Sequence, residues 1–446
     1  MEIIILLLFA VVLLCCVCFN ISILFALLIG YLLFSGLTLK RGYSFRQLVK
    51  MSVNGIISAR NILITFVLIG VLTALWRAGG TIPAIVYYSS GLMKPELFVV
   101  ITFLLNCLIS VLTGTAFGTA ATMGAVCMSV ASSLSINPVL VGGAVLSGVY
   151  FGDRCSPVST SALLVSELTE TNLYDNIKNM IKTSAVPFVL TCIIYYLSGL
   201  FLPVTSAADN NVCDIFINEF SISILTVVPA IIVVLLAIAR VNVKITMLAS
   251  IAASVFVCVF CQGYDFTEVL RFSVFGYTAD NEQLSVIING GGIISMLRVA
   301  LIVCISSAYS GIFKNTGFLT SVRNVIDGIR NKYTAFAVVL ITSVIASVVA
   351  CNQTLTIMLT EQLCCHTEEN KSKLAVYLEN SAVIIAPLVP WSIAGNVPLT
   401  SAGAPVLSIG CAVFLYILPL YSLMVSIYEN NRHNNRIKDK FSDNSL

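Results

Sequence analysis

The chain has 446 residues, of which 58% are hydrophobic and only 10% are charged. A water-soluble domain carries about 25% charged residues because its surface has to be solvated, so this composition excludes a soluble globule. The net charge of +3 is too small to predict a nucleic-acid partner. The 15 cysteines are odd in number and lie mostly in apolar segments, which argues against a disulfide framework.

Ten apolar segments follow one another along the chain, each close to the ~20 residues that a helix needs to cross ~30 Å of hydrocarbon. Helices are the expected form because lipid offers no partner to unsatisfied backbone amides. The first segment lacks the basic start and the cleavage site of a signal peptide, so it is predicted to be the first span. The segments cover residues 3–19, 21–39, 62–76, 97–112, 183–202, 221–239, 245–261, 285–309, 334–350 and 404–427.

Lysine and arginine in the connections between these segments predict the cytoplasmic side of the membrane. Residues 203–219 contain three acidic residues and no basic one, so they are predicted to lie outside. These assignments alternate along the chain and place both termini in the cytoplasm of a cell-membrane protein. The basic residues are Lys40, Arg41, Arg46 and Lys50, then Arg240 and Lys244, then Lys314, Arg323, Arg330 and Lys332, and finally Arg432, Arg436, Lys438 and Lys440.

The same alternation divides the chain into two halves of opposite orientation, each crossing five times around an irregular middle. Residues 1–202 form the first predicted transmembrane repeat, residues 203–219 an extracytoplasmic linker, residues 220–428 the inverted repeat and residues 429–446 a cytoplasmic tail. This plan is typical of inverted-repeat transporters, whose site lies near the bilayer midplane where helices are broken. Residues 113–115 (Thr-Gly-Thr) take the place in the first half that residues 351–354 (Cys-Asn-Gln-Thr) take in the second.

The two irregular middles, residues 113–160 and 351–395, are predicted to form re-entrant or discontinuous helical hairpins. Glycine lets backbones approach closely, and hydroxyl groups satisfy carbonyls that a broken helix frees. In the first middle, Gly152 and Pro157 flank a polar run that contains Asp153, and in the second Pro387 follows Glu379. The predicted fold class is therefore an all-α polytopic membrane protein with about ten transmembrane helices, two such hairpins and an inverted-topology repeat.

A charged side chain at membrane depth costs roughly 2.5–3.5 kcal/mol even on insertion scales, so the two carboxylates require an explanation. In a structural explanation, Asp153 pairs with Arg154 at a helix end and Glu379 lies in a hydrated loop. In a functional one, both bind sodium, a hard cation that by analogy with calcium prefers carboxylate, hydroxyl, amide and backbone oxygens. Desolvation favours the protonated carboxyl group, so one site holding either ion suffices for antiport. The candidate sodium and proton ligands are Asp153, Ser156, Thr115, Thr119, Asn352, Gln353, Glu379 and Asn380.

At these residues the chain resembles the NhaC family of sodium/proton antiporters, within a broader ion-transporter superfamily. The most specific motif is Tyr150-Phe-Gly-Asp153 followed by Ser156-Pro157. The resemblance covers most of the chain and implies electrochemically driven exchange of cytoplasmic sodium for external protons. It also includes residues 41–45, 80–83, 114–119, 351–354, 379–381 and 387–391.

Two positions depart from the family pattern. Related members often have an acidic residue where Asn352 stands and a Glu-Asp pair where Glu379 and Asn380 stand, which leaves the coupling ion and stoichiometry open. Some relatives exchange small carboxylates, such as malate against lactate, so exchange of small organic anions or of amino acids is the alternative function. Arg298, a further charge in an apolar segment, would bind a substrate carboxylate in that case, or else it pairs structurally or reaches the interface.

An enzyme is not expected, because an intramembrane enzyme needs a nucleophile–base pair or a metal cluster. The two histidines, His366 and His433, lie in a loop and in the C-terminal tail. No cofactor is expected besides the transported sodium ions and protons. The expected partners are the lipid bilayer and these ions, without nucleic acid, and a homodimer is an open assembly. A channel is the alternative class, and uncoupled flux that does not saturate would distinguish it.

Overall fold

A computed structural model describes residues 22–90, 95–134, 136–157, 159–201, 216–239, 241–279, 288–316 and 333–443, with isolated residues before position 22 and Ser285. These residues form helices and no sheet, apart from one isolated bridge between Tyr277 and Gly290. The predictions that fall on the first apolar segment, on most of the linker 203–219 and on the basic connection 323–332 lie largely outside the described residues. The predicted all-helical class is confirmed for the rest.

Helices follow one another through both halves, and several are short segments separated by sharp breaks. The first half contains α2 (Ile23–Lys40), α3 (Phe45–Ser58), α4 (Arg60–Ala78), α5 (Thr81–Ser90), α6 (Pro95–Thr113), α7 (Ala116–Thr119), the π-helix η1 (Ala120–Gly124), α8 (Ala125–Ser133), α9 (Pro138–Cys155), α10 (Thr160–Leu168) and α11 (Leu173–Leu200). The second half contains α13 (Ile224–Ile238), α14 (Val243–Phe260), α15 (Phe266–Phe275), η2 (Ile293–Met296), α17 (Leu297–Thr316), α19 (Ala335–Ala350), α20 (Gln353–Cys364), α21 (Lys371–Asn380), α22 (Ala382–Ile385), η3 (Ala386–Leu388), α23 (Ile393–Ala402), η4 (Val406–Cys411) and α24 (Val413–Asp443).

Within the described residues, four helical stretches are long and apolar enough to cross a membrane. A fifth candidate is a bent pair, residues 371–388 and 393–402, whose two parts meet at 60°. Six further apolar helices are shorter, among them those that begin at Leu63, Ala116 and Ala335. The molecule is thus a helical membrane protein with interrupted spans. The four stretches are Glu96–Thr113, Leu173–Leu200, Ile293–Phe313 and Val413–Arg432.

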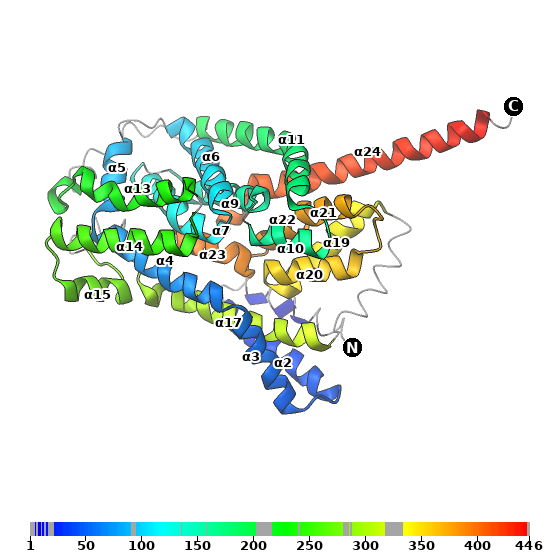
Figure 1. Cartoon of the computed structure of the whole chain (residues 1–446), viewed down its shortest axis with the longest axis horizontal. Helices are drawn as coiled ribbons and strands as arrows, with labels where there is room; N and C mark the ends of the chain where they lie inside the picture. The colour runs from blue at the N-terminus through cyan, green and yellow to red at the C-terminus, as the bar shows by residue number, and fades with distance from the viewer. Residues whose placement is uncertain are drawn as a thin grey trace.

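The connection that carries Arg46 and Lys50 is itself a helix, α3. Its start is fixed by a capping box, in which the Gln47 backbone N–H donates to Ser44 Oγ at 3.3 Å and the Ser44 N–H donates to Gln47 Oε1 at 2.8 Å. Such a box satisfies two amides that a helix start leaves without partners. At the other end of the chain, α24 continues as one helix to Asp443 and extends away from the body (Figure 1).

Helix α9 lies near the middle of the body between α6 and α24 (Figure 1). Its glycines allow this tight packing, because a Cβ on Gly148 would lie 2.7 Å from the Phe103 carbonyl oxygen of α6, and one on Gly152 would lie 2.3 Å from the Ser110 Cβ. On its other side, a Cβ on Gly143 would lie 2.4 Å from the Cys411 carbonyl oxygen of η4. Small residues let helix backbones approach closely in membranes, so this packing fixes where the end of α9 lies.

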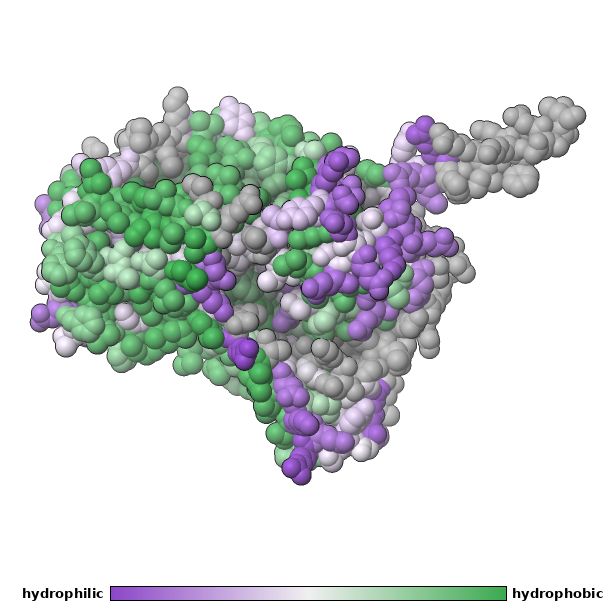
Figure 2. Space-filling model, in the orientation of Figure 1, coloured by the Kyte–Doolittle hydropathy of each residue, from purple (hydrophilic) through white to green (hydrophobic). Residues whose placement is uncertain are grey.

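The surface is divided between apolar and polar regions. Figure 2 shows hydrophobic residues over the side formed by α13, α14 and α15, and hydrophilic residues gathered on the opposite side, near α21 and the start of the projecting part of α24. Exposed side chains on the first side include Leu235, Phe256 and Phe275. A broad apolar surface of this kind suits contact with lipid. The core draws on both halves in one main cluster of buried apolar residues.

Candidate ion site

Asp153 is buried in the last turn of α9, with 5% of its surface exposed. Its Oδ1 accepts a hydrogen bond from Ser159 Oγ at 3.0 Å, and its Oδ2 accepts one from Ser161 Oγ at 2.9 Å. The side chain of Gln353 and the backbone N–H of Ala116 also interact with this carboxylate. Donors from three separate segments therefore surround one buried acidic group.

The positions of these donors follow from local breaks in the helices. Helix α9 ends at Cys155, and Pro157 cannot continue it because proline lacks the N–H and restricts the residue before it. The chain resumes as α10, for which Ser159 is the N-cap. Gln353 is the first residue of α20, after the N-cap Asn352. The Asp153 carboxylate thus lies near the N-terminal ends of α10 and α20, where helix dipoles favour negative charge.

The predicted polar ligands do not all meet at Asp153. Thr115 caps α7, where its Oγ1 accepts from the Gly118 N–H at 3.3 Å, while Thr119 is buried and shares a 3.0 Å hydrogen bond with Thr113. Asn352 Oδ1 accepts from the Thr354 N–H at 2.9 Å. Ser156 is fully buried just beyond the end of α9. Among the predicted hydroxyl and amide ligands, Gln353 interacts with the Asp153 carboxylate, and Thr115 directly precedes Ala116, whose backbone N–H also does.

Asn380 takes part in a second polar cluster, centred on Arg154. Arg154 is fully buried, and its guanidinium donates to Asn380 Oδ1, to Ser184 Oγ and, at 3.3 Å, to Thr183 Oγ1. Asn380 Nδ2 in turn donates to Ser422 Oγ of α24 at 2.9 Å. The predicted structural pairing of Asp153 with Arg154 does not occur, because each side chain binds other partners. This cluster joins α9 and α11 of the first half to α21 and α24 of the second.

Glu379 precedes Asn380 in α21 and is buried, with 1% of its surface exposed. Within the described residues, neither of its carboxylate oxygens has a hydrogen-bond partner. Its charge interacts with those of Arg154 and Asp153. The alternative that Glu379 lies in a hydrated loop is therefore wrong. A buried carboxylate without a donor is costly unless a proton or a cation accompanies it, and either one would relieve this cost for Glu379.

A polar cavity of about 470 Å³ lies between α11, α21 and α24. Asn380 and Thr183 contribute to its wall, so the cavity reaches two residues that bind Arg154. Lys182, Lys373 and Glu429 also line it and are exposed. The cavity brings solvent-accessible space to the polar cluster around Arg154.

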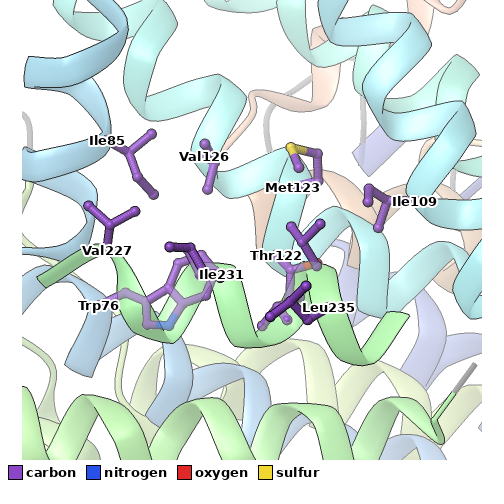
Figure 3. A pocket seen from close by; sticks show the side chains of 12 residues that line it. Trp76, Ile85, Ile109, Thr122, Met123, Val126, Val227, Ile231 and Leu235 are labelled. Atoms are coloured by element: carbon purple, nitrogen blue, oxygen red, sulfur yellow. The ribbon is translucent and has the colours of Figure 1, made fainter. Parts of the chain in front are cut away.

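A different cavity, of about 310 Å³, is apolar. Figure 3 shows Trp76, Ile85, Met123 and Ile231 around it, and Thr122 also lines it. The polar atoms of Trp76 and Thr122 are already used, because the indole donates to Ser250 Oγ at 3.0 Å and the hydroxyl donates to the Gly118 carbonyl at 2.8 Å. Among these side chains only the Thr122 hydroxyl carries an oxygen, and a sodium ion needs several oxygen ligands, so the cavity is unsuited to sodium.

The sequence-based site omitted Ser159, Ser161, Thr183 and Ser184. The first two stand in a Ser-Thr-Ser run that begins two residues after Pro157, which is a usable signal, because a break that follows a buried acid places the next hydroxyls near it. The other two lie in the long helix α11 and give no such signal. Arg298, in contrast, is exposed in the first turn of α17, which does not support a role in binding a buried substrate.

A protein-family model matches most of the chain. The model of the "Na+/H+ antiporter family" matches residues 2–166 and 148–428. The two matched regions include Asp153 in both and Glu379 in the second. The match therefore spans the whole of the candidate site described above.

Several characterised or named proteins are similar over about four-fifths of their length. The chain is 28% identical to the malate-2H+/Na+-lactate antiporter of Bacillus subtilis, over 82% of this chain and 81% of that protein. It is 27% identical to the Na+/H+ antiporter NhaC of Alkalihalophilus pseudofirmus, over 80% and 79%. It is 25% identical to the arginine/ornithine antiporter ArcD of Halobacterium salinarum, over 82% and 78%.

Proposed function

Because this chain belongs to the Na+/H+ antiporter family, we propose that it is a secondary active transporter that exchanges sodium ions for protons across the cell membrane. The predicted resemblance to NhaC is confirmed by relatives of that name. The family consists of transporters, which matches the expectation that the chain is not an enzyme. The direction of exchange, cytoplasmic sodium against external protons, and the cytoplasmic location of both termini are parts of the proposal.

The buried carboxylate of Asp153 is the observation that supports this function best. It lies at a helix break, near the starts of α10 from the first half and α20 from the second. Its surroundings supply the hydroxyl oxygens of Ser159 and Ser161, which a hard cation accepts as ligands. When sodium leaves, a proton can neutralise the same carboxylate. Since a single group holds one ion or the other, inward movement of one is coupled to outward movement of the other.

The polar cavity between α11, α21 and α24 is the proposed aqueous approach from one side of the membrane. Alternating access requires that the same carboxylate later face the other side. In inverted-repeat transporters the site changes the side that it faces through rigid-body rocking of one bundle against another. The convergence of breaks from both halves on Asp153 suits such a motion, because movement of α20 relative to α9 would alter access to the carboxylate.

Asp153→Asn tests this function, since the amide keeps the size of the side chain but removes its charge. Purified protein in liposomes with an imposed pH gradient should collapse the gradient when sodium is added, and the Asp153→Asn protein should not. A Ser166→Ala protein is the matched control, because the Ser166 hydroxyl donates to the Leu163 carbonyl of its own helix rather than to Asp153. Normal sodium-dependent proton flux in the Asp153→Asn protein would refute the site.

Competition between the two cations provides a second readout of the same proposal. Protons and sodium compete for one carboxylate, so the sodium concentration for half-maximal exchange should rise as the pH falls. Lithium, as another small hard cation, should substitute for sodium. Rates that are indifferent to both cations would point to a different cargo.

A second candidate function is sodium- and proton-coupled exchange of small organic anions or amino acids. The polar cavity favours it, because about 470 Å³ exceeds what a bare cation needs and its lining carries Lys182, Lys373 and Glu429. Ligand pockets for small molecules begin at about 300 Å³. Sodium-driven pH change measured with and without malate, lactate, arginine and ornithine would separate the two functions. A requirement for one of these solutes would establish the second.

A further inference from the structure

Among the described residues, every acceptor of the Arg154 guanidinium is electrically neutral. The groups are the Asn380 amide oxygen, the hydroxyls of Ser184 and Thr183, and the Met180 carbonyl at 3.5 Å. In the described part of the chain no carboxylate forms an ion pair with Arg154. A guanidinium cannot lose its proton in a protein, so this buried residue keeps a full positive charge that its hydrogen bonds leave uncompensated.

The carboxylate of Glu379 interacts electrostatically with that charge, and the carboxylate of Asp153 interacts with Glu379. The side chains of Arg154, Glu379 and Asp153 are all buried. With both acids ionised, two negative charges and one positive charge leave the cluster with one net negative charge. Uncompensated charge is costly in a medium of low dielectric constant. One monovalent cation is therefore enough to make the cluster neutral.

We propose that Asn380 determines how many monovalent cations the cluster carries, by leaving the charge of Arg154 free to offset Glu379. The inference deepens the proposed function and rests on it. An acid at position 380 would stand where the amide oxygen of Asn380 now accepts from Arg154, and it would form a charge-assisted pair with the guanidinium. Glu379 would then lose its compensation, and the cluster would take up a second cation.

Asn380→Asp tests the proposal, because it adds one negative charge with almost no change in shape. Equilibrium binding of radioactive sodium to the purified protein at alkaline pH should rise from one ion per chain to two. Ser166→Ala is the control, because its hydroxyl donates to the Leu163 carbonyl of its own helix and lies outside the cluster, and it should leave the number of bound sodium ions unchanged.

If the Asn380→Asp protein does not fold, a pair of variants that moves the negative charge from position 379 to position 380 still tests the proposal. Glu379→Gln alone should make the empty cluster neutral and weaken sodium binding by about tenfold or more. Glu379→Gln combined with Asn380→Asp returns the net charge to one negative and should restore binding to within a few-fold of the wild type. A double variant that binds sodium no better than Glu379→Gln would overturn the proposal. A folded Asn380→Asp protein that binds only one sodium ion per chain would overturn it too.

These outcomes are distinguishable from failure of the proposed function. A wild-type protein that binds no sodium would refute antiport itself. A wild-type protein that binds one sodium ion, together with an Asn380→Asp protein that also binds one, would refute only the role of Asn380.

Discussion

Gly114 and Cys351 have the same left-handed backbone conformation, with φ angles of 65° and 51°. Each is followed by an extended N-cap residue: Thr115 has φ −148° and ψ 123°, and Asn352 has φ −151° and ψ 131°. In each case the cap side chain accepts a backbone N–H and a new helix begins. The predicted repeat pairs these two breaks, and they share this local geometry. The relation between the complete halves stays a prediction.

Gly114→Ala should destabilise the protein by about 1–2 kcal/mol, the cost of the left-handed region for a residue with a Cβ. The measurement is the free energy of unfolding in detergent micelles. Gly36→Ala is the matched control, because Gly36 lies within α2 and a Cβ there would have nothing within 4 Å. Alanine in a helix interior should stabilise by about 0.5–1 kcal/mol. Equal effects of the two changes would show that the break at Gly114 carries no conformational constraint.

Gly152→Ala should impair transport more than it impairs folding. The added Cβ would lie 2.3 Å from Ser110 Cβ and 2.5 Å from the Val111 nitrogen, so α9 would have to move away from α6. Overpacking of this kind costs typically 1–3 kcal/mol, and the shift would displace Asp153, the next residue. Exchange in proteoliposomes should fall by about tenfold or more, since misplacement by about 1 Å can cost a hundredfold.

Gly410→Ala serves as the control for that experiment, because a Cβ on Gly410 would meet no atom within 4 Å. It should leave exchange and unfolding unchanged. A Gly152→Ala protein with normal exchange would show that the distance between α6 and α9 does not position the carboxylate.

Much of the fold could be predicted because it rests on local chemistry. Long apolar segments indicated membrane helices, and Pro157, Gly114 and the polar residues around them indicated the breaks. The apolar surroundings of Asp153 and Glu379 in the sequence raised their burial as one of two explanations, and the structure buries both. The helix α3 was missed, although its capping residues Ser44 and Gln47 are visible in the sequence.

The partners of the charged residues could not be predicted, because they depend on tertiary packing. Arg154 was considered as the partner of Asp153 because the two are neighbours in sequence. Successive residues on a helix do not face each other, and Arg154 instead binds Asn380, 226 positions away. Serines and threonines are common in helix packing, so nothing in the sequence distinguished Ser184 from other buried hydroxyls.

Ser159→Ala and Ser161→Ala should each weaken sodium binding. Each removes one donor to Asp153, and hydrogen bonds to charged groups contribute about 1.5–3 kcal/mol. The sodium concentration for half-maximal exchange at a fixed alkaline pH should therefore rise by about tenfold, and by more in the double variant. Ser166→Ala, in the same helix but bonded to Leu163, should change it little. Indistinguishable values for Ser161→Ala and Ser166→Ala would exclude Ser161 from the site.

Glu170 and Lys371 form an exposed ion pair between the turn before α11 and the start of α21. The hydrogen bond and the charge of Lys371 lower the pKa of the Glu170 carboxyl below its ordinary value. Because the pKa of this carboxyl is lower in the folded than in the unfolded chain, the pair stabilises the fold at pH above the unfolded pKa of about 4.3. This contribution disappears as the pH falls through the lower pKa of the folded chain. Glu170→Gln should therefore destabilise the protein slightly at neutral pH and low salt.

The loss of stability in the Glu170→Gln protein should be smaller at acidic pH. It should also be smaller in about 1 M salt, which screens exposed charges. Glutamine shares the left-handed backbone cost at this position, where φ is 53°, so that cost cancels in the comparison. Thermal unfolding of Glu170→Gln, Lys371→Gln and the double variant should show non-additive effects, because the second change removes a partner already lost. Glu369→Gln, in the connection just before Lys371, is the control for the removal of an exposed acidic charge. If Glu170→Gln behaves like Glu369→Gln at every pH and salt concentration, the pair does not hold the two segments together.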